Sequence, residues 1–168
     1  RGLHDTLAHS LMALLTQIRL MRKLGPRWSR EQLDAELADT ETLAASGLVD
    51  VVAHPDFIKV CCYDDFQAWL KQPGSLDLIA GALTAMRDSD TAMEVSSAGL
   101  RKPFHEPYPG PAIMGIAADL GLTISFGSDA HAASETVSHF EELARYARSY
   151  GFKNNRIAVA RERILLDF

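Results

Sequence analysis

The sequence has few cysteines, no long apolar run and no excess of basic residues, and each absence excludes a class of protein. Its two cysteines, Cys61 and Cys62, are adjacent and cannot join distant segments, which is typical of a reducing cytoplasm. No stretch approaches the roughly 18 apolar residues of a membrane span. With 17 basic and 22 acidic residues, the chain offers no basic stripe for nucleic acid. We therefore expect a cytoplasmic protein that binds neither membranes nor nucleic acids.

The 168 residues, of which 47% are apolar, are enough to bury a core of their own. The chain begins at Arg1 rather than at a methionine. This start predicts that the sequence is a fragment of a longer protein.

Residues 3–24 carry apolar side chains at alternating spacings of four and three, which predicts an amphipathic helix with the seam of a coiled coil or bundle. Gly25 and Pro26 follow and would end that helix. The residues of the seam are Leu7, Leu11, Leu14, Ile18 and Met21.

A second helix is predicted to begin after Ser29, because Gln32 stands three residues later and completes a capping box. Gly47 marks its end. One face of this helix would hold Leu33, Leu37, Thr40 and Ala44. We therefore predict a helical hairpin as a first domain, residues 1–47.

From Leu48 the pattern changes to alternating strands and helices, which predicts parallel βα units and an α/β fold for a second domain, residues 48–168. The expected strands are 48–54, 91–97, 122–129 and 156–160, and the expected helices are 75–89, 109–121 and 134–151.

Three of these strands end in polar, turn-rich segments: AHPD (53–56), EVSSAGLR (94–101) and GSDAH (127–131). In parallel α/β folds, the functional side chains gather where the strands end. Imidazole and carboxylate groups suit zinc, manganese or iron. The strand ends therefore predict a divalent metal site, with His54, Asp129 and His131 as ligands.

The segments GLVDVVAHPDFIKV, TAMEVSSAGLRKPFHEPYP and LGLTISFGSDAH resemble, in this order, the later motifs of the PHP-family histidinol phosphatases. The resemblance covers about residues 42–168. It implies a distorted (β/α)7 barrel that binds up to three divalent metals and hydrolyses histidinol phosphate, a step of histidine biosynthesis. The family's opening histidine motifs are not in this sequence, so we expect a partial barrel with little or no activity.

By match to the family, His54, Asp129 and His131 would be metal ligands. Arg101 would be the catalytic residue, whose guanidinium would bind the substrate phosphate through bidentate hydrogen bonds. Lys59 and Ser97 would bind substrate in the same pocket. The metals would lower the pKa of a bound water, so that hydroxide could attack phosphorus near neutral pH.

The segment LHDTLAHSLMALLTQIRL resembles the dimerisation and phosphoacceptor helix of sensor histidine kinases. By match, His4 would be the phosphoacceptor, Asp5 the adjacent base and His9 a water-positioning residue. This resemblance implies an alternative function, a dimerising phosphoacceptor module, and a homodimer formed through the hairpin. Simple packing of a bundle helix explains His4 and His9 without chemistry, and it is the favoured interpretation of the two.

Four further residues near the predicted site have a structural interpretation, either as an alternative to a functional one or as the favoured one. Glu94 could orient a metal ligand or make a structural bond. Asp56 could cap a turn or contact a metal. A surface loop is the favoured place for Glu106, and packing is the favoured role for Tyr108.

Overall fold

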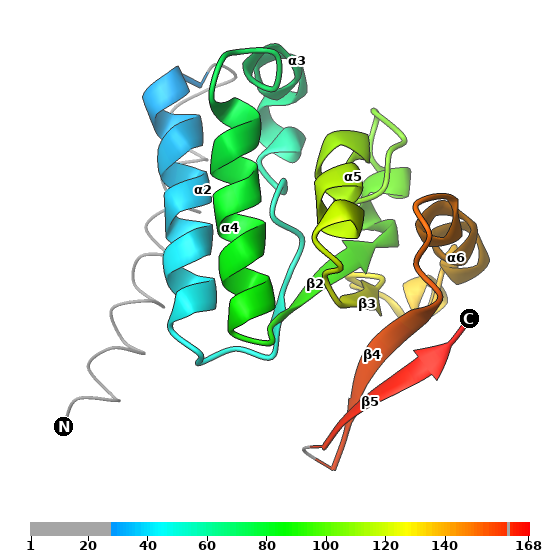
Figure 1. Ribbon diagram of the computed structural model, residues 1–168. Helices are drawn as coiled ribbons and strands as arrows, with labels where there is room; N and C mark the ends of the chain where they lie inside the picture. Colours follow the sequence, from blue (N-terminus) through cyan, green and yellow to red (C-terminus); the bar gives the residue numbers. More distant parts are fainter. Residues whose placement is uncertain (1–27, 161) are drawn as a thin grey trace, which may run out of the picture.

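The computed structural model describes residues 28–160 and 162–168, and its mixed helix–sheet architecture confirms the predicted α/β class (Figure 1). The helix predicted over residues 3–24 lies outside the described part of the chain. In chain order the elements are α2 (Arg30–Ala45), β1 (Val51–Val52), α3 (Lys59–Trp69), α4 (Ser75–Asp88), β2 (Ala92–Ser96), the 3₁₀ turn η1 (Ser97–Arg101), α5 (Pro111–Asp119), β3 (Ile124–Gly127), the 3₁₀ turn η2 (Ala133–Glu135), α6 (Phe140–Ser149), β4 (Asn154–Val159) and β5 (Glu162–Asp167).

The main sheet consists of β1, β2 and β3 in that order, and both neighbouring pairs are parallel. Val51 lies opposite Ala92, and Met93 lies opposite Ile124. Because parallel strands end at the same edge, the polar segments after all three strands lie along one edge of the sheet. Three parallel strands among the described residues do not confirm the closed barrel implied by the resemblance.

The predicted capping box begins α2 as expected. The backbone N–H of Ser29 donates to Gln32 Oε1 at 2.8 Å, and the N–H of Gln32 donates to Ser29 Oγ at 3.4 Å. Gly47, with φ +65°, follows the helix end. The apolar face of α2 packs on α4 (Figure 1), and its buried side chains are Leu33, Leu37 and Ala44.

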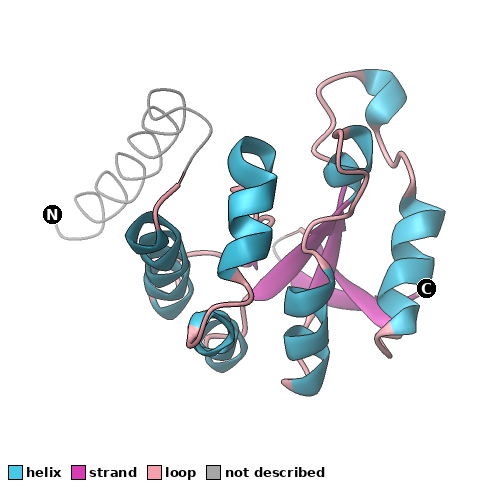
Figure 2. Cartoon of the chain, turned by 90° about the horizontal axis from the view of Figure 1, so that it is seen from above, coloured by secondary structure: helices cyan, strands magenta, loops and turns pink. Residues whose placement is uncertain are grey.

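The core lies between the sheet and the helices that surround it, as the view in Figure 2 shows. The central strand β2 is the most deeply buried strand, with Glu94 its least buried residue. Apolar side chains of the strands and of α4 and α5 fill this core: Val52, Met93, Val95, Ile124, Ile79, Leu83, Met86, Ile113, Met114 and Ala117.

Two parts of the fold were not expected from the sequence. The helix α3 follows the His-Pro-Asp segment directly and buries Lys59, Phe66 and Trp69. Its backbone is kinked at Cys62 (φ −150°, ψ 57°). Leu76 lies at the start of α4 and is 46% exposed, although it stands three residues before the buried Ile79.

The C-terminal part corrects two predictions. The helix predicted from residue 134 begins only at Phe140, because Val137 (φ +53°) and His139 (φ +60°) have left-handed backbone conformations that no α-helix contains. The strand predicted over 156–160 is not the last one. It is β4, which continues into β5 as a separate antiparallel pair.

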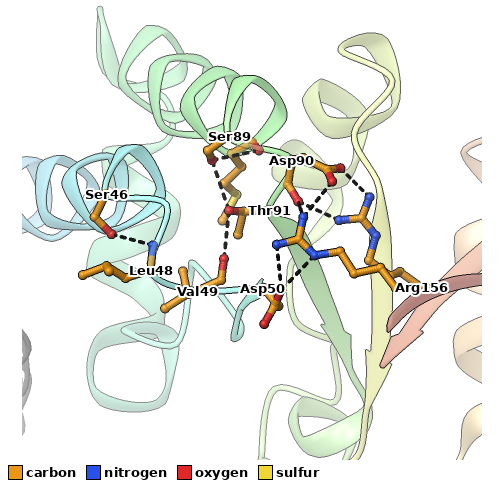
Figure 3. Close-up of polar contacts among 10 residues, drawn as sticks. Ser46, Leu48, Val49, Asp50, Ser89, Asp90, Thr91 and Arg156 are labelled. Atoms are coloured by element: carbon orange, nitrogen blue, oxygen red, sulfur yellow. Dashed lines mark hydrogen bonds and ion pairs between the residues drawn. The ribbon is translucent and has the colours of Figure 1, made fainter. Parts of the chain in front are cut away.

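Arginine–aspartate pairs attach this β4–β5 hairpin to the amino-terminal ends of β1 and β2 (Figure 3). Arg156 Nη2 lies 2.5 Å from Asp90 Oδ1. Arg163 lies 2.7 Å from Asp90 Oδ2 and 2.6 Å from Asp50 Oδ1. These contacts are at the opposite end of the sheet from the polar strand ends. Among the described helices, none is both long and apolar enough to cross a membrane.

Candidate functional site

Two of the predicted ligands stand at strand ends with an unusual backbone. His54 follows β1 with φ +42°, and Asp129 follows β3 with φ +46°. Residues other than glycine adopt this left-handed region uncommonly, and such positions cluster at functional sites. Both strand ends share this backbone with five other non-glycine residues of the described ranges, so side-chain contacts are needed as well to define a site.

Glu94 on the central strand connects these two positions electrostatically. Burial raises the pKa of its carboxyl, the charge of Asp129 raises it further, and His54 opposes the rise. The carboxylate occupies the space beside Gly127, where a Cβ atom would overlap Glu94 Oε1. Glu94, His54 and Asp129 therefore share one electrostatic environment at the edge of the sheet.

Several buried polar atoms around this edge have no hydrogen-bond partner among the described residues. An unsatisfied buried donor or acceptor costs about 1–3 kcal/mol, so a concentration of them indicates a place where another group binds. The atoms are Asp56 Oδ1, Glu94 Oε2, Ser97 Oγ, Arg101 Nη1 and the Tyr108 hydroxyl.

Arg101 forms hydrogen bonds with the loop that follows β3. Its Nη2 donates to the carbonyl of Ser128 at 2.8 Å and to that of Asp129 at 3.1 Å. The same nitrogen lies 3.6 Å from Glu135 Oε2. These contacts hold the Asp129 loop in place and leave Nη1 as the unpaired donor.

His131 belongs to the same loop but points outward. Its side chain is 80% exposed, and its Nδ1 lies 2.9 Å from the carbonyl oxygen of Asp129. The backbone N–H of His131 donates to Glu135 Oε2 at 2.9 Å, and this bond is the main cause of the lowered Glu135 pKa. The structure thus joins Asp129, His131 and Arg101 through one loop, with the imidazole of His131 facing solvent.

Lys59 is buried, and all of its partners are internal. Its Nζ lies 2.7 Å from Asp56 Oδ2, contacts Glu106 Oε1 and donates to the carbonyl of Pro107 at 3.1 Å. Asp56 Oδ2 also accepts the backbone N–H of Gly110 at 2.7 Å, at the start of α5. Asp56 thus contacts Lys59 and the start of α5, and these contacts decide neither of the two interpretations open for Asp56. Its burial raises its pKa, and Lys59 opposes that rise.

Tyr108 was assigned to packing, and its surroundings indicate more. Its backbone exchanges two hydrogen bonds with Ser96, of 2.6 and 3.0 Å, and its peptide bond to Pro109 is cis. The ring centre lies 6.0 Å from that of His54. Burial is the main cause of the raised pKa of its hydroxyl, and the charges of Asp56 and Asp129 add to the rise. The available sequence signal was the Tyr-Pro pair that leads into α5.

The candidate ligands have the chemistry that the expected metal needs, but there are too few of them among the described residues. Imidazole and carboxylate oxygen suit a divalent cation, and Glu94 Oε2 is an unpaired acceptor beside His54 and Asp129. Within residues 28–160 and 162–168, no three His, Cys, Asp or Glu side chains form a group that could hold a metal ion. A cavity of about 190 Å³ lies beside the start of α5, where Asp56, Glu106 and Gly110 line it and His54 and Asp129 do not.

The residues of the alternative phosphoacceptor function, His4, Asp5 and His9, lie outside the described residues. The structure therefore places none of them relative to the sheet.

Comparison with known proteins finds similarity to two curated proteins. The chain is 32% identical over 111 residues to a "Probable histidinol-phosphatase" of Deinococcus radiodurans, which covers 66% of this chain and 40% of that protein. It is 29% identical over 128 residues to a "Probable phosphatase" of Aeromonas hydrophila subsp. hydrophila, which covers 73% of this chain and 44% of that protein. Both relatives are named as phosphatases. The chain matches less than half the length of either relative.

A family model matches the N-terminal segment of the chain. Residues 1–52 match the family described as histidine kinase. The family match is confined to residues 1–52, whereas the two curated relatives match 66% and 73% of the chain.

Proposed function

We propose that the chain contributes the later strands of a metal-dependent phosphatase that hydrolyses a small phosphate monoester. The resemblance and the name of the Deinococcus relative favour histidinol phosphate and histidine biosynthesis. The observation that carries the proposal is the group of unpaired buried polar atoms beside His54, Glu94 and Asp129. We place this activity in the cytoplasm.

In this proposal, His54 and Asp129 would hold a divalent ion (zinc, manganese or iron), and His131, whose imidazole faces solvent in this structure, would have to turn inward to join them. A divalent ion bound there would supply hydroxide near neutral pH and offset charge on the phosphoryl group. Arg101 keeps the Asp129 loop in place with Nη2 and offers Nη1 to a phosphoryl oxygen. Ser97 offers its unpaired hydroxyl to the same anion.

Lys59 was predicted to bind substrate, and its buried position gives that role less support than the position of Arg101 does. Glu94 interacts electrostatically with both His54 and Asp129. Its carboxylate would orient the side chain of one of them toward a bound cation. Together these residues would bind, orient and neutralise a phosphate ester at the sheet edge.

The experiment is a measurement of histidinol phosphate binding and hydrolysis by the purified chain, after chelation and again after refilling with Mn²⁺. We expect metal-dependent binding and slow turnover. An Arg101→Met variant should bind the substrate at least about tenfold more weakly, because a charged hydrogen bond contributes about 1.5–3 kcal/mol. Arg87→Met is the matched control, since exposed Arg87 pairs only with neighbouring Asp88 among the described residues. Equal binding by Arg101→Met and by the wild type would contradict the proposal.

The match of residues 1–52 to the histidine kinase family favours a second candidate function, a phosphoacceptor module that dimerises through the hairpin. Metal content and light scattering of the purified chain separate the two candidates. A metal-loaded chain supports the phosphatase, and a metal-free helical dimer supports the phosphoacceptor module.

A further inference from the structure

Lys59 is a buried cation whose partners come from two different loops of the candidate site. Asp56 belongs to the loop after β1, and its Oδ2 lies 2.7 Å from Lys59 Nζ. Glu106 and Pro107 belong to the segment that leads into α5, and both accept hydrogen bonds from the same ammonium. One side chain therefore joins the loop that carries His54 to the segment that carries Tyr108.

Aromatic rings continue this connection from Lys59 to His54. The ammonium lies 4.9 Å from the ring centre of Tyr108, a cation–π distance. The Tyr108 ring lies 6.0 Å from the rings of both His54 and Phe57. Phe57 in turn stacks on His54 at 4.9 Å. The imidazole of His54 thus contacts the rings of Phe57 and Tyr108, and the Tyr108 ring in turn contacts the Lys59 ammonium.

The packing around the ammonium leaves little freedom. The side chain of Lys59 is fully buried, and a Cβ atom at Gly110 would lie 3.1 Å from Nζ and overlap Glu106 Oε1. An apolar side chain of similar size would avoid the desolvation of a buried charge. It would not tie two loops together at hydrogen-bonding distances, because it has no donors.

We propose that Lys59 is a positioning residue, which fixes the loop after β1 against the segment leading into α5 and so orients His54 and Tyr108. The inference rests on the proposed function, since that function assigns His54 to the site. The side chain of Lys59 acts through its partners and contacts neither substrate nor metal.

The test is an NMR comparison of aromatic side chains in the metal-free 168-residue chain. In the wild type we expect through-space cross-peaks from His54 to the rings of Phe57 and Tyr108. In Lys59→Met these cross-peaks should be lost and the His54 and Tyr108 signals should shift, while the signals of His131 and His139 stay in place. Leu37→Ala is the matched control, because it truncates a buried residue of α2 that lies in the core and outside these contacts.

A second variant covers the case in which Lys59→Met does not fold. Glu106→Ala removes one partner of the ammonium, a carboxylate that is 19% exposed, and should weaken the same cross-peaks in a folded chain. Unchanged cross-peaks in the folded variants, or equal losses in Leu37→Ala, would overturn the positioning role. Since no metal or substrate is present, this result is independent of the hydrolysis assay. A wild type that neither binds nor hydrolyses histidinol phosphate would contradict the proposed function alone.

Discussion

Gly127 on β3 leaves the space that the carboxylate of Glu94 on β2 occupies. A Cβ atom at position 127 would overlap Glu94 Oε1 and lie 2.6 Å from its carboxyl carbon. The two residues stand on neighbouring parallel strands, where Glu94 lies opposite Ser125 and Gly127 lies opposite Ser96. The absence of a side chain on one strand therefore allows a partly buried acid on the next.

The first prediction follows from this close approach. Gly127→Ala should lower the free energy of unfolding by about 1–3 kcal/mol, because the added methyl group displaces the Glu94 carboxylate. Urea unfolding measures the change. The control is Gly115→Ala in α5, where nothing lies within 4 Å of the added Cβ and alanine should stabilise the helix by about 0.5–1 kcal/mol. A Gly127→Ala chain as stable as the wild type would show that the Glu94 carboxylate lies elsewhere.

The second prediction concerns the pH dependence that Glu94 confers on stability. Its pKa is raised in the folded chain, mainly by burial, so the folded state holds the proton more tightly than the unfolded state does. The stabilisation is then complete below the unfolded pKa near 4.5 and is lost as the pH rises through the higher folded value. Glu94→Gln removes this loss, so the variant should gain stability over the wild type between pH 5 and pH 7.5.

Urea midpoints of both chains at the two pH values, with a chelator present, measure this difference. Asp56 also has a raised pKa and contributes to both chains equally, so the comparison isolates Glu94. A difference between wild type and variant that stays constant with pH would mean that the Glu94 carboxyl titrates normally.

The third prediction concerns the attachment of the β4–β5 hairpin (Figure 3). Asp90 receives contacts from both Arg156 and Arg163, which also hold its pKa below the usual range. Asp90→Asn should speed hydrogen exchange in β4 and β5 and leave exchange in β2 unchanged. Because the Asp90 side chain is 65% exposed and that of Arg163 39% exposed, global stability should change little. Asp88→Asn is the matched control, since Arg87 is the partner that the structure gives Asp88. Equal exchange rates in the two variants would assign the hairpin's attachment to other contacts.

The fourth prediction concerns assembly. Leu14 belongs to the predicted seam of residues 3–24, and the apolar face of α2 is already used on α4. A seam of this length therefore needs a partner, and we expect a homodimer through the hairpin. Light scattering should give a dimer for the wild type and a monomer for Leu14→Glu. A monomeric wild type would rule out the dimer, and a dimeric variant would rule out the seam as its interface.

The sequence predicted those parts of the fold whose signals are local. The capping box of Ser29 and Gln32 was visible because both members lie within one helical turn. The parallel order of β1, β2 and β3 followed from the alternation of strands and helices. The late start of α6 was missed, because left-handed conformations are uncommon for residues such as Val137 and His139 and nothing in the local residue types indicates them.

The candidate site, too, could be predicted only where its signals are local in the sequence. The strand ends at His54 and Asp129 could be located from motif and strand position alone. The roles of Tyr108 and Glu106 could not, since both depend on contacts with Lys59, 49 and 47 positions earlier in the sequence. Buried ion pairs between distant segments leave no periodic pattern in a sequence.

The central claim is that the strand ends at His54 and Asp129 bind a divalent metal, and calorimetric titration of Zn²⁺ into the chelator-treated chain tests it most directly. We predict uptake by the wild type, affinity more than about tenfold weaker in Asp129→Ala, and no change in His139→Ala, whose exposed imidazole pairs with Glu142. No uptake by the wild type, or equal affinity in the wild type and Asp129→Ala, would contradict the claim.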